Sequence, residues 1–84
     1  MNLNELRNEI DLIDQDMREL FEKRMSIVKK VKAYKKEHQM NILDSSRELD
    51  VIHKNVSKIN DETLRDAYQR FLQFVMDLSK ELQQ

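Results

Sequence analysis

The sequence predicts an all-α fold with three helices per chain, and two observations carry this prediction. Glycine and proline are absent from all 84 residues, so the residues that usually interrupt helices do not occur. Apolar residues recur in alternating steps of three and four along most of the chain, which is the spacing of an amphipathic helix. At this length we expect a single domain over residues 1–84.

The first helix is predicted to be long. Asn2 or Asn4 can cap its start, and lysines crowd its far end, where the helix dipole favours cations. At about 33–36 residues it would extend about 50 Å, whereas a compact chain of this size is about 30 Å across. Because its own chain cannot cover it, we expect an intertwined helical homodimer. The predicted stripe comprises Leu3, Leu6, Ile10, Ile13, Met17, Leu20, Ile27, Val31 and Tyr34.

A short second helix and a third of medium length follow. Asp44 or Ser45 is predicted to start the second, because Ser45 and Glu48 match a capping box. Its apolar residues are Leu49, Ile52, Val56 and Ile59. Asn60 and Asp61 then break the pattern before the third helix. The third helix carries Leu64, Tyr68, Phe71, Val75, Leu78 and Leu82.

Composition excludes several classes of function. Without cysteine there is no disulfide framework, zinc knuckle or thiol nucleophile, and without glycine there is no phosphate-binding loop. Fifteen basic and sixteen acidic residues give a net charge of −1, which favours neither nucleic acid nor an anionic membrane. We find no membrane-spanning run or leader, and we expect a cytoplasmic protein. Only Asp50–His53 approaches a di-iron motif, so no metal or cofactor is expected.

Arg24 occupies a position on the apolar stripe between Leu20 and Ile27. A buried guanidinium is costly unless an anion pairs with it through several hydrogen bonds. The arginine is explained either by an internal ion pair or register-setting role, or by an anion site inside the helical assembly. This residue alone leaves both explanations open.

Arg7 and Lys35 lie on the same side of the first helix as Arg24, about 40 Å apart along its axis. Taken singly, each is explained as a solvated surface charge. In two antiparallel copies, however, the early residues of one helix approach the late residues of the other. Arg7 of one copy and Lys35 of the other could then reach one ligand.

Four further polar residues have structural explanations of their own. Ser79 and Gln83 are four residues apart and face one way, which a polar helix end also explains. Asp44 and Glu48 are explained as residues that cap the second helix. None of these four residues indicates a site when taken alone.

Taken in order, these residues resemble the AroQ-type (all-helical) chorismate mutase family over essentially the whole chain. The intervals between the polar members are 17, 11, 9, 3, 1, 31 and 4 residues. The resemblance rests on Leu6-Arg7 with Ile10, Ile13 and Asp14, on Glu22-Lys23-Arg24, on Val31-Lys32-Ala33-Tyr34-Lys35, on Asp44, Arg47 and Glu48, and on Val75-Met76, Ser79 and Gln83.

The resemblance implies an isomerase of aromatic amino acid biosynthesis that converts chorismate to prephenate in a concerted rearrangement without a cofactor. It implies an intertwined dimer in which each of two sites borrows an arginine from the neighbouring subunit. Arg7 would be the borrowed arginine, and with Arg24 it would bind the two substrate carboxylates. Lys35 and Gln83 would donate hydrogen bonds to the ether oxygen, where negative charge develops.

The same resemblance assigns supporting roles to the remaining polar residues. Glu48 and the backbone near Asp44 would hold the ring hydroxyl of chorismate. Arg47 and Ser79 would support one carboxylate. All of these roles are expectations from the resemblance.

Two alternative functions share this fold. Isochorismate–pyruvate lyases have much the same polar set, and incubation with each substrate would separate the two activities. The other alternative is a helical interaction module, or a regulatory domain of a shikimate-pathway synthase, which would be the partner. The complete polar set favours an enzyme over a scaffold.

Overall fold

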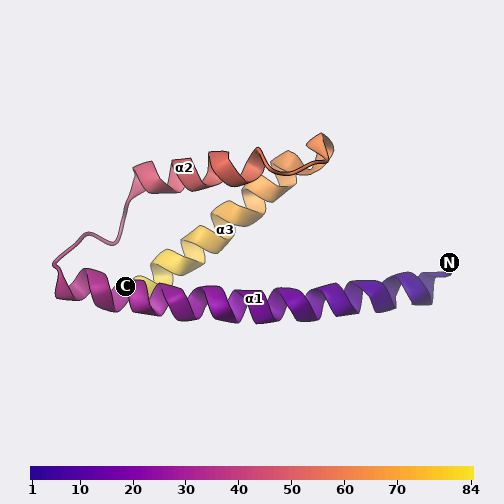
Figure 1. Cartoon of the computed structure of the whole chain (residues 1–84), viewed down its shortest axis with the longest axis horizontal. Helices are drawn as coiled ribbons and strands as arrows, with labels where there is room; N and C mark the ends of the chain where they lie inside the picture. The colour runs from indigo at the N-terminus through magenta and orange to yellow at the C-terminus, as the bar shows by residue number, and fades with distance from the viewer.

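The computed structural model describes residues 1–84 and contains three α-helices and one short 3₁₀ turn (Figure 1). The long helix α1 spans Leu3–Glu37, α2 spans Ser45–Val56, and α3 spans Arg65–Gln83. The 3₁₀ turn η1, Glu62–Leu64, leads directly into α3. The predicted all-α class, with a long, a short and a medium helix, is confirmed. None of the three helices combines the length and apolar character that a membrane crossing requires.

Local hydrogen bonds explain where α1 begins and ends. The Asn2 side chain accepts a hydrogen bond from the Glu5 backbone N–H at 2.9 Å, which caps the start. At the other end Gln39 has a φ of 54°, and the Met40 N–H donates to the Lys35 carbonyl at 2.8 Å. This left-handed ending usually carries glycine. In a chain without glycine, Gln39 takes that position.

The connection between α2 and α3 differs from the sequence prediction. Helix α2 ends at Val56, so Ile59 lies in the connection after the helix rather than on it. Asp61 then begins η1, because its carboxylate accepts hydrogen bonds from the Thr63 backbone N–H at 3.0 Å and from the Thr63 hydroxyl at 2.6 Å. The Asn60–Asp61 break was predicted correctly, but a 3₁₀ turn precedes the third helix.

Helix α3 connects the other two helices, since it contacts both α1 and α2 (Figure 1). The chain measures 54 × 25 × 16 Å and its radius of gyration is 16.0 Å. A compact chain of this length would have a radius of gyration of about 12 Å. The long α1 extends well beyond the region that α3 covers, as Figure 1 shows.

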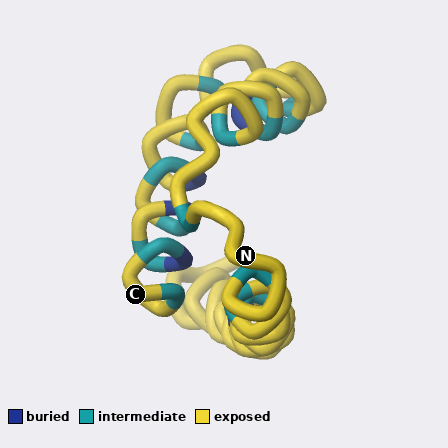
Figure 2. The backbone as a smooth tube through the Cα atoms, turned by 90° about the vertical axis from the view of Figure 1, so that its left-hand side faces the viewer, coloured by how far each residue is buried: buried dark blue, intermediate teal, exposed yellow.

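The core within one chain is small. Ile52, Leu72 and Met76 form its buried centre, and Met25 is the only buried residue of α1. Figure 2 shows how few positions of the backbone are buried. The core therefore uses the face of α3 beside the predicted stripe, through Leu72, Met76 and Ser79. The predicted stripe of α1 remains exposed instead.

Candidate active site

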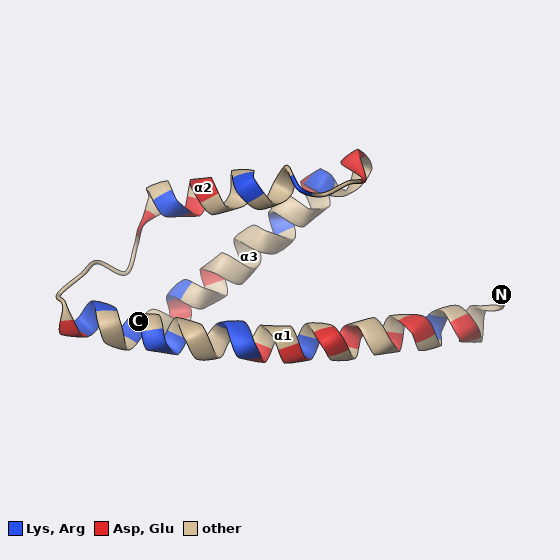
Figure 3. Ribbon diagram, viewed as in Figure 1, with Lys and Arg blue, Asp and Glu red and all other residues tan.

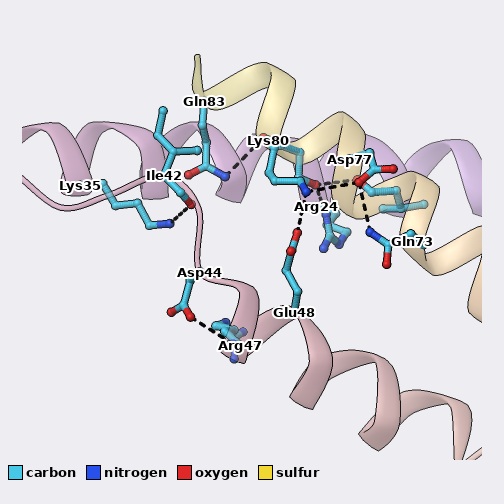
Figure 4. A network of polar contacts seen from close by, with 12 residues as sticks. Arg24, Lys35, Ile42, Asp44, Arg47, Glu48, Gln73, Asp77, Lys80 and Gln83 are labelled. Atoms are coloured by element: carbon cyan, nitrogen blue, oxygen red, sulfur yellow. Dashed lines mark hydrogen bonds and ion pairs between the residues drawn. The ribbon is translucent and has the colours of Figure 1, made fainter.

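A cavity of about 180 Å³ lies where the three helices approach one another. This volume is smaller than the roughly 300–1,000 Å³ typical of ligand pockets. A small volume is expected for a site to which the predicted second copy of the chain adds a wall. Figure 4 shows its polar side chains converging from different helices. Its lining comprises Arg24, Val28, Val31 and Lys35 of α1, Ile42 and Asp44 of the connection before α2, Arg47, Glu48 and Val51 of α2, and Met76, Ser79, Lys80 and Gln83 of α3.

The guanidinium of Arg24 is tied to α3 through Ser79. Arg24 Nη1 donates a hydrogen bond to Ser79 Oγ, and the same hydroxyl donates to the Val75 carbonyl at 2.9 Å. Ser79 is buried, with 6% of its surface exposed, whereas Arg24 is exposed. Arg24 is therefore not a buried member of the α1 stripe in one chain. It is held at the cavity wall with donors to spare.

Lys35 reaches back to the connection between α1 and α2. Its Nζ donates a hydrogen bond to the Ile42 carbonyl at 2.9 Å, and its side chain is partly buried. An ammonium carries three donors, so two remain available after this contact. The connection thus holds the Lys35 amine at the cavity, as Figure 4 shows.

Asp44 caps the start of α2, as predicted for this residue, whereas Ser45 and Glu48 do not form the capping box that their spacing matches. The Asp44 carboxylate accepts a hydrogen bond from the Arg47 backbone N–H at 3.1 Å. The Glu48 carboxylate pairs with Lys80 of α3 instead of with a backbone N–H. Asp44 and Arg47 therefore lie at the rim of the cavity, and Glu48 faces another helix across it (Figure 4).

Lys80 is a lining residue that the sequence reasoning missed. Its Nζ lies 3.0 Å from Glu48 Oε1 and 3.4 Å from Asp77 Oδ1. The hydrogen bond to Glu48 raises the pKa of Lys80 above its usual value, and the bond to Asp77 acts in the same direction. The sequence does give one indication of its role. Lys80 lies next to Ser79 and three residues before Gln83, so it is on the same side of the helix as Gln83.

Gln83 is partly buried at the end of α3 and has unused hydrogen-bonding capacity. Its Nε2 donates to the Ser79 carbonyl at 3.3 Å, which leaves the second amide hydrogen free. Its Oε1 is buried and makes no hydrogen bond within the chain. The amide therefore retains a free donor for a ligand in the cavity.

The cavity brings together seven of the eight side chains predicted from the sequence. The exception is Arg7, which is exposed on α1 and does not line the cavity. It lies 17 residues before Arg24, or about 26 Å along the helix. One chain therefore cannot bring Arg7 into this cavity. The seven are Arg24, Lys35, Asp44, Arg47, Glu48, Ser79 and Gln83.

The cavity carries four cationic and two carboxylate side chains, a net charge of +2. Arginine and lysine donors at this density suit a ligand that carries more than one carboxylate. The lining includes neither cysteine nor histidine, and the chain contains no group of three side chains placed to hold a metal ion. The arrangement can bind and orient a dianion and place donors around it.

A larger apolar groove of about 780 Å³ lies beside the cavity. Arg24 and Val51 line both hollows. The groove is formed by residues from the middle of α1 and from α2 and α3. Its other lining residues are Asp14, Met17, Arg18, Leu20, Phe21, Asn55, Tyr68, Phe71, Leu72, Phe74, Val75 and Leu78.

Comparison with known proteins identifies the family. Neither the curated proteins nor the solved structures that were compared gave a match. The family model described as chorismate mutase type II, a family of isomerases, matches residues 6–84. The matched range includes every residue that lines the cavity. The chain therefore belongs to the chorismate mutase type II family.

Proposed function

We propose that this protein catalyses the rearrangement of chorismate to prephenate, a step of aromatic amino acid biosynthesis, at a site completed by a second copy of the chain. The observation that carries the proposal is the convergence of seven predicted side chains on one cavity with a net charge of +2. Chorismate carries two carboxylates, so the charges of cavity and substrate are complementary. The family match supports the same reaction.

The reaction requires the substrate to be held in a folded conformer, because one bond breaks as another forms within the same molecule. It requires no nucleophile and no proton transfer. Catalysis then comes from orientation and from donors aimed at the oxygen where charge develops. The spare donors of Lys35 and Gln83 fit the ether oxygen. Glu48, as a carboxylate, fits the ring hydroxyl.

Arginine suits the substrate carboxylates because its planar group binds a carboxylate through two parallel hydrogen bonds. We assign Arg24 to one carboxylate, with its orientation fixed by Ser79. Arg47 lies at the rim and supports the same end. Arg7 of the partner subunit would bind the other carboxylate and would raise the net charge of the site to about +3.

The exposed apolar surface of α1 supports the second copy. Leu3, Ile13 and Leu20 are each more than half exposed in one chain. Soluble monomers rarely expose a continuous apolar stripe of this length. The groove beside the cavity is lined mostly by apolar side chains, which suits it to receive another α1.

The charge distribution of α1 supports an antiparallel pairing. Residues 3–22 contain seven acidic and two basic side chains, whereas residues 23–37 contain one acidic and seven basic side chains. Figure 3 shows this change of sign along the helix. In an antiparallel pair, the acidic half of each α1 faces the basic half of the other. A parallel pair would oppose like charges along the whole contact.

The groove also sets the register of this pairing. Met17 and Leu20 lie near the middle of its α1 wall. A two-fold axis beside them places residue 7 of one copy level with about residue 30 of the other. Val28 and Val31, on either side of that level, line the cavity. The same register that covers the apolar stripe therefore brings Arg7 of the partner subunit to the site.

Loss of chorismate absorbance, with prephenate identified as the product, tests the reaction, and isochorismate serves as the comparison substrate. The shared site is tested by mixing two variants. Arg7→Ala and Arg24→Ala homodimers should each be nearly inactive. In an equal mixture half of the dimers are mixed and each regains one site, so about a quarter of the wild-type activity should return.

The matched control mixes Arg24→Ala with Lys35→Ala. Both substitutions remove residues of the home chain, so no mixed dimer regains a complete site and activity should stay low. Recovery in the control, or no recovery in the first mixture after subunit exchange is verified, would contradict the shared site. No prephenate from the wild-type protein would contradict the proposed reaction.

A further inference from the structure

Lys80 lies between two carboxylates at the wall of the cavity. It joins α3 to α2 by pairing with Glu48 at 3.0 Å, and it contacts Asp77 one turn earlier on its own helix at 3.4 Å. The Lys80 and Glu48 side chains are partly buried, with exposed fractions of 29% and 20%. Asp77 is half exposed. Asp77, one turn earlier on α3, therefore holds the Lys80 ammonium, which is directed towards Glu48 (Figure 4).

The pairing uses only part of each group. Lys80 contacts Oε1 of Glu48, which leaves Oε2 able to accept a hydrogen bond from a ligand. The other charged groups lining the cavity with Glu48 are Arg24 and Lys35 of α1 and Asp44 and Arg47 at the start of α2. None of these four has a hydrogen bond or ion pair with the Glu48 carboxylate. Within the chain, Lys80 alone fixes the carboxylate.

We propose that Lys80 is a positioning residue for the reaction: tethered by Asp77, it holds the Glu48 carboxylate in the orientation that accepts the ring hydroxyl of chorismate. This inference rests on the proposed function and on the role of Glu48 in it. Glu48 has several rotatable bonds, and ordering such a side chain costs conformational entropy. The ion pair with Lys80 orders the Glu48 side chain before the substrate binds, so the carboxylate is preorganised as a hydrogen-bond acceptor.

The proposal predicts which kinetic constant changes. The ring hydroxyl takes no part in the bond changes, so its hydrogen bond to Glu48 has the same strength in the substrate complex and in the transition state. Loss of such an interaction raises KM and leaves kcat nearly unchanged. A general loosening of α3 would instead displace Ser79 and Gln83 and lower kcat. The change in KM compared with the change in kcat therefore separates a positioning role of Lys80 from structural damage to α3.

Kinetics of the dimeric protein with chorismate test the proposal. Lys80→Met should raise KM about tenfold, equivalent to about 1.4 kcal/mol, and keep kcat within about twofold of wild type. Lys80→Arg, which keeps the cation, should restore most of the affinity. Lys36→Met is the matched control, because it removes one exposed cation from the same end of the molecule without touching the cavity. Circular dichroism and sedimentation confirm fold and assembly.

A double-mutant cycle tests whether Lys80 acts through Glu48. Glu48→Gln alone should raise KM at least as much as Lys80→Met does. In the Glu48→Gln background, Lys80→Met should then have little further effect. Full additivity would show that Lys80 attracts the substrate by itself, and would overturn the proposal.

The outcomes separate this inference from the proposed function. Wild-type kinetics in Lys80→Met, with Glu48→Gln impaired, would overturn the role of Lys80 and leave the proposed function intact. Wild-type kinetics in Glu48→Gln would overturn the assignment of Glu48 and this inference together. A fall in kcat for Lys80→Met, with KM unchanged, would also overturn the positioning role.

Discussion

Replacing Ser79 by alanine isolates the hydrogen bond that orients Arg24. Ser79 is buried and accepts a hydrogen bond from the guanidinium, so alanine removes the acceptor while keeping the backbone and nearly the same volume. Hydrogen bonds to charged groups contribute about 1.5–3 kcal/mol. Arg24 is exposed in one chain, where water can replace the lost partner, so the lower value applies. We expect kcat/KM to fall about tenfold.

The same substitution should lower the free energy of unfolding by no more than about 1.5 kcal/mol, because only the hydrogen bond to Arg24 is lost at a real cost. Ser79 also donates to the Val75 carbonyl four residues earlier, a contact that contributes little to a helix, and alanine is the better helix former. The assay combines chorismate kinetics with urea unfolding at one fixed protein concentration. Ser57→Ala is the control, because its hydroxyl contacts only the Lys54 carbonyl on the surface. Wild-type kcat/KM in Ser79→Ala would refute the reasoning.

Three further predictions concern stability and assembly. Leu72→Ala should lower the free energy of unfolding by about 2–5 kcal/mol, because Leu72 is in the core. Leu49 is exposed, so Leu49→Ala should change the free energy of unfolding little. Urea unfolding measures both variants. Met17→Glu lines the groove with a carboxylate near the proposed two-fold axis, so sedimentation should show monomers and activity should be lost. Hydrogen bonds from Thr63 lower the pKa of Asp61 below its usual value of 3.8. The ionised carboxylate therefore stabilises the folded chain above about pH 3.8, and this contribution is lost as the pH falls through the lowered pKa. Asp61→Asn should therefore weaken the acid dependence of unfolding, and an unchanged slope would contradict the assignment.

The helices could be predicted from the sequence because apolar spacing and capping residues act locally. Asn2 and Asp61 mark their elements through contacts within three residues. Helix α1, at 35 residues, has the predicted length, although Gln39 after its end takes a left-handed conformation that normally indicates glycine. Ile59 has helical spacing but follows the end of α2, since spacing alone does not show where backbone hydrogen bonding stops.

Arg47 of the candidate site was predicted only through the resemblance to the family, whereas other site residues could be predicted because they depart from the apolar pattern. Arg24 and Ser79 stood out for that reason, and the structure joins them. Lys80 did not stand out, because a lysine at the polar border of a helix fits an ordinary surface. Its role follows from the approach of α2, which brings Glu48 to 3.0 Å. That contact depends on tertiary packing, which the spacing of residues within one helix does not specify.

The small number of buried residues has a consequence for how activity depends on protein concentration. Only five of 84 side chains are buried within one chain, too few to offset the loss of chain entropy on folding. We therefore expect folding and pairing to occur together. Dilution would then unfold the protein as well as separate its subunits, and specific activity would fall steeply below a threshold concentration. The amount of protein made in the cell would set not only how many sites exist but whether they exist.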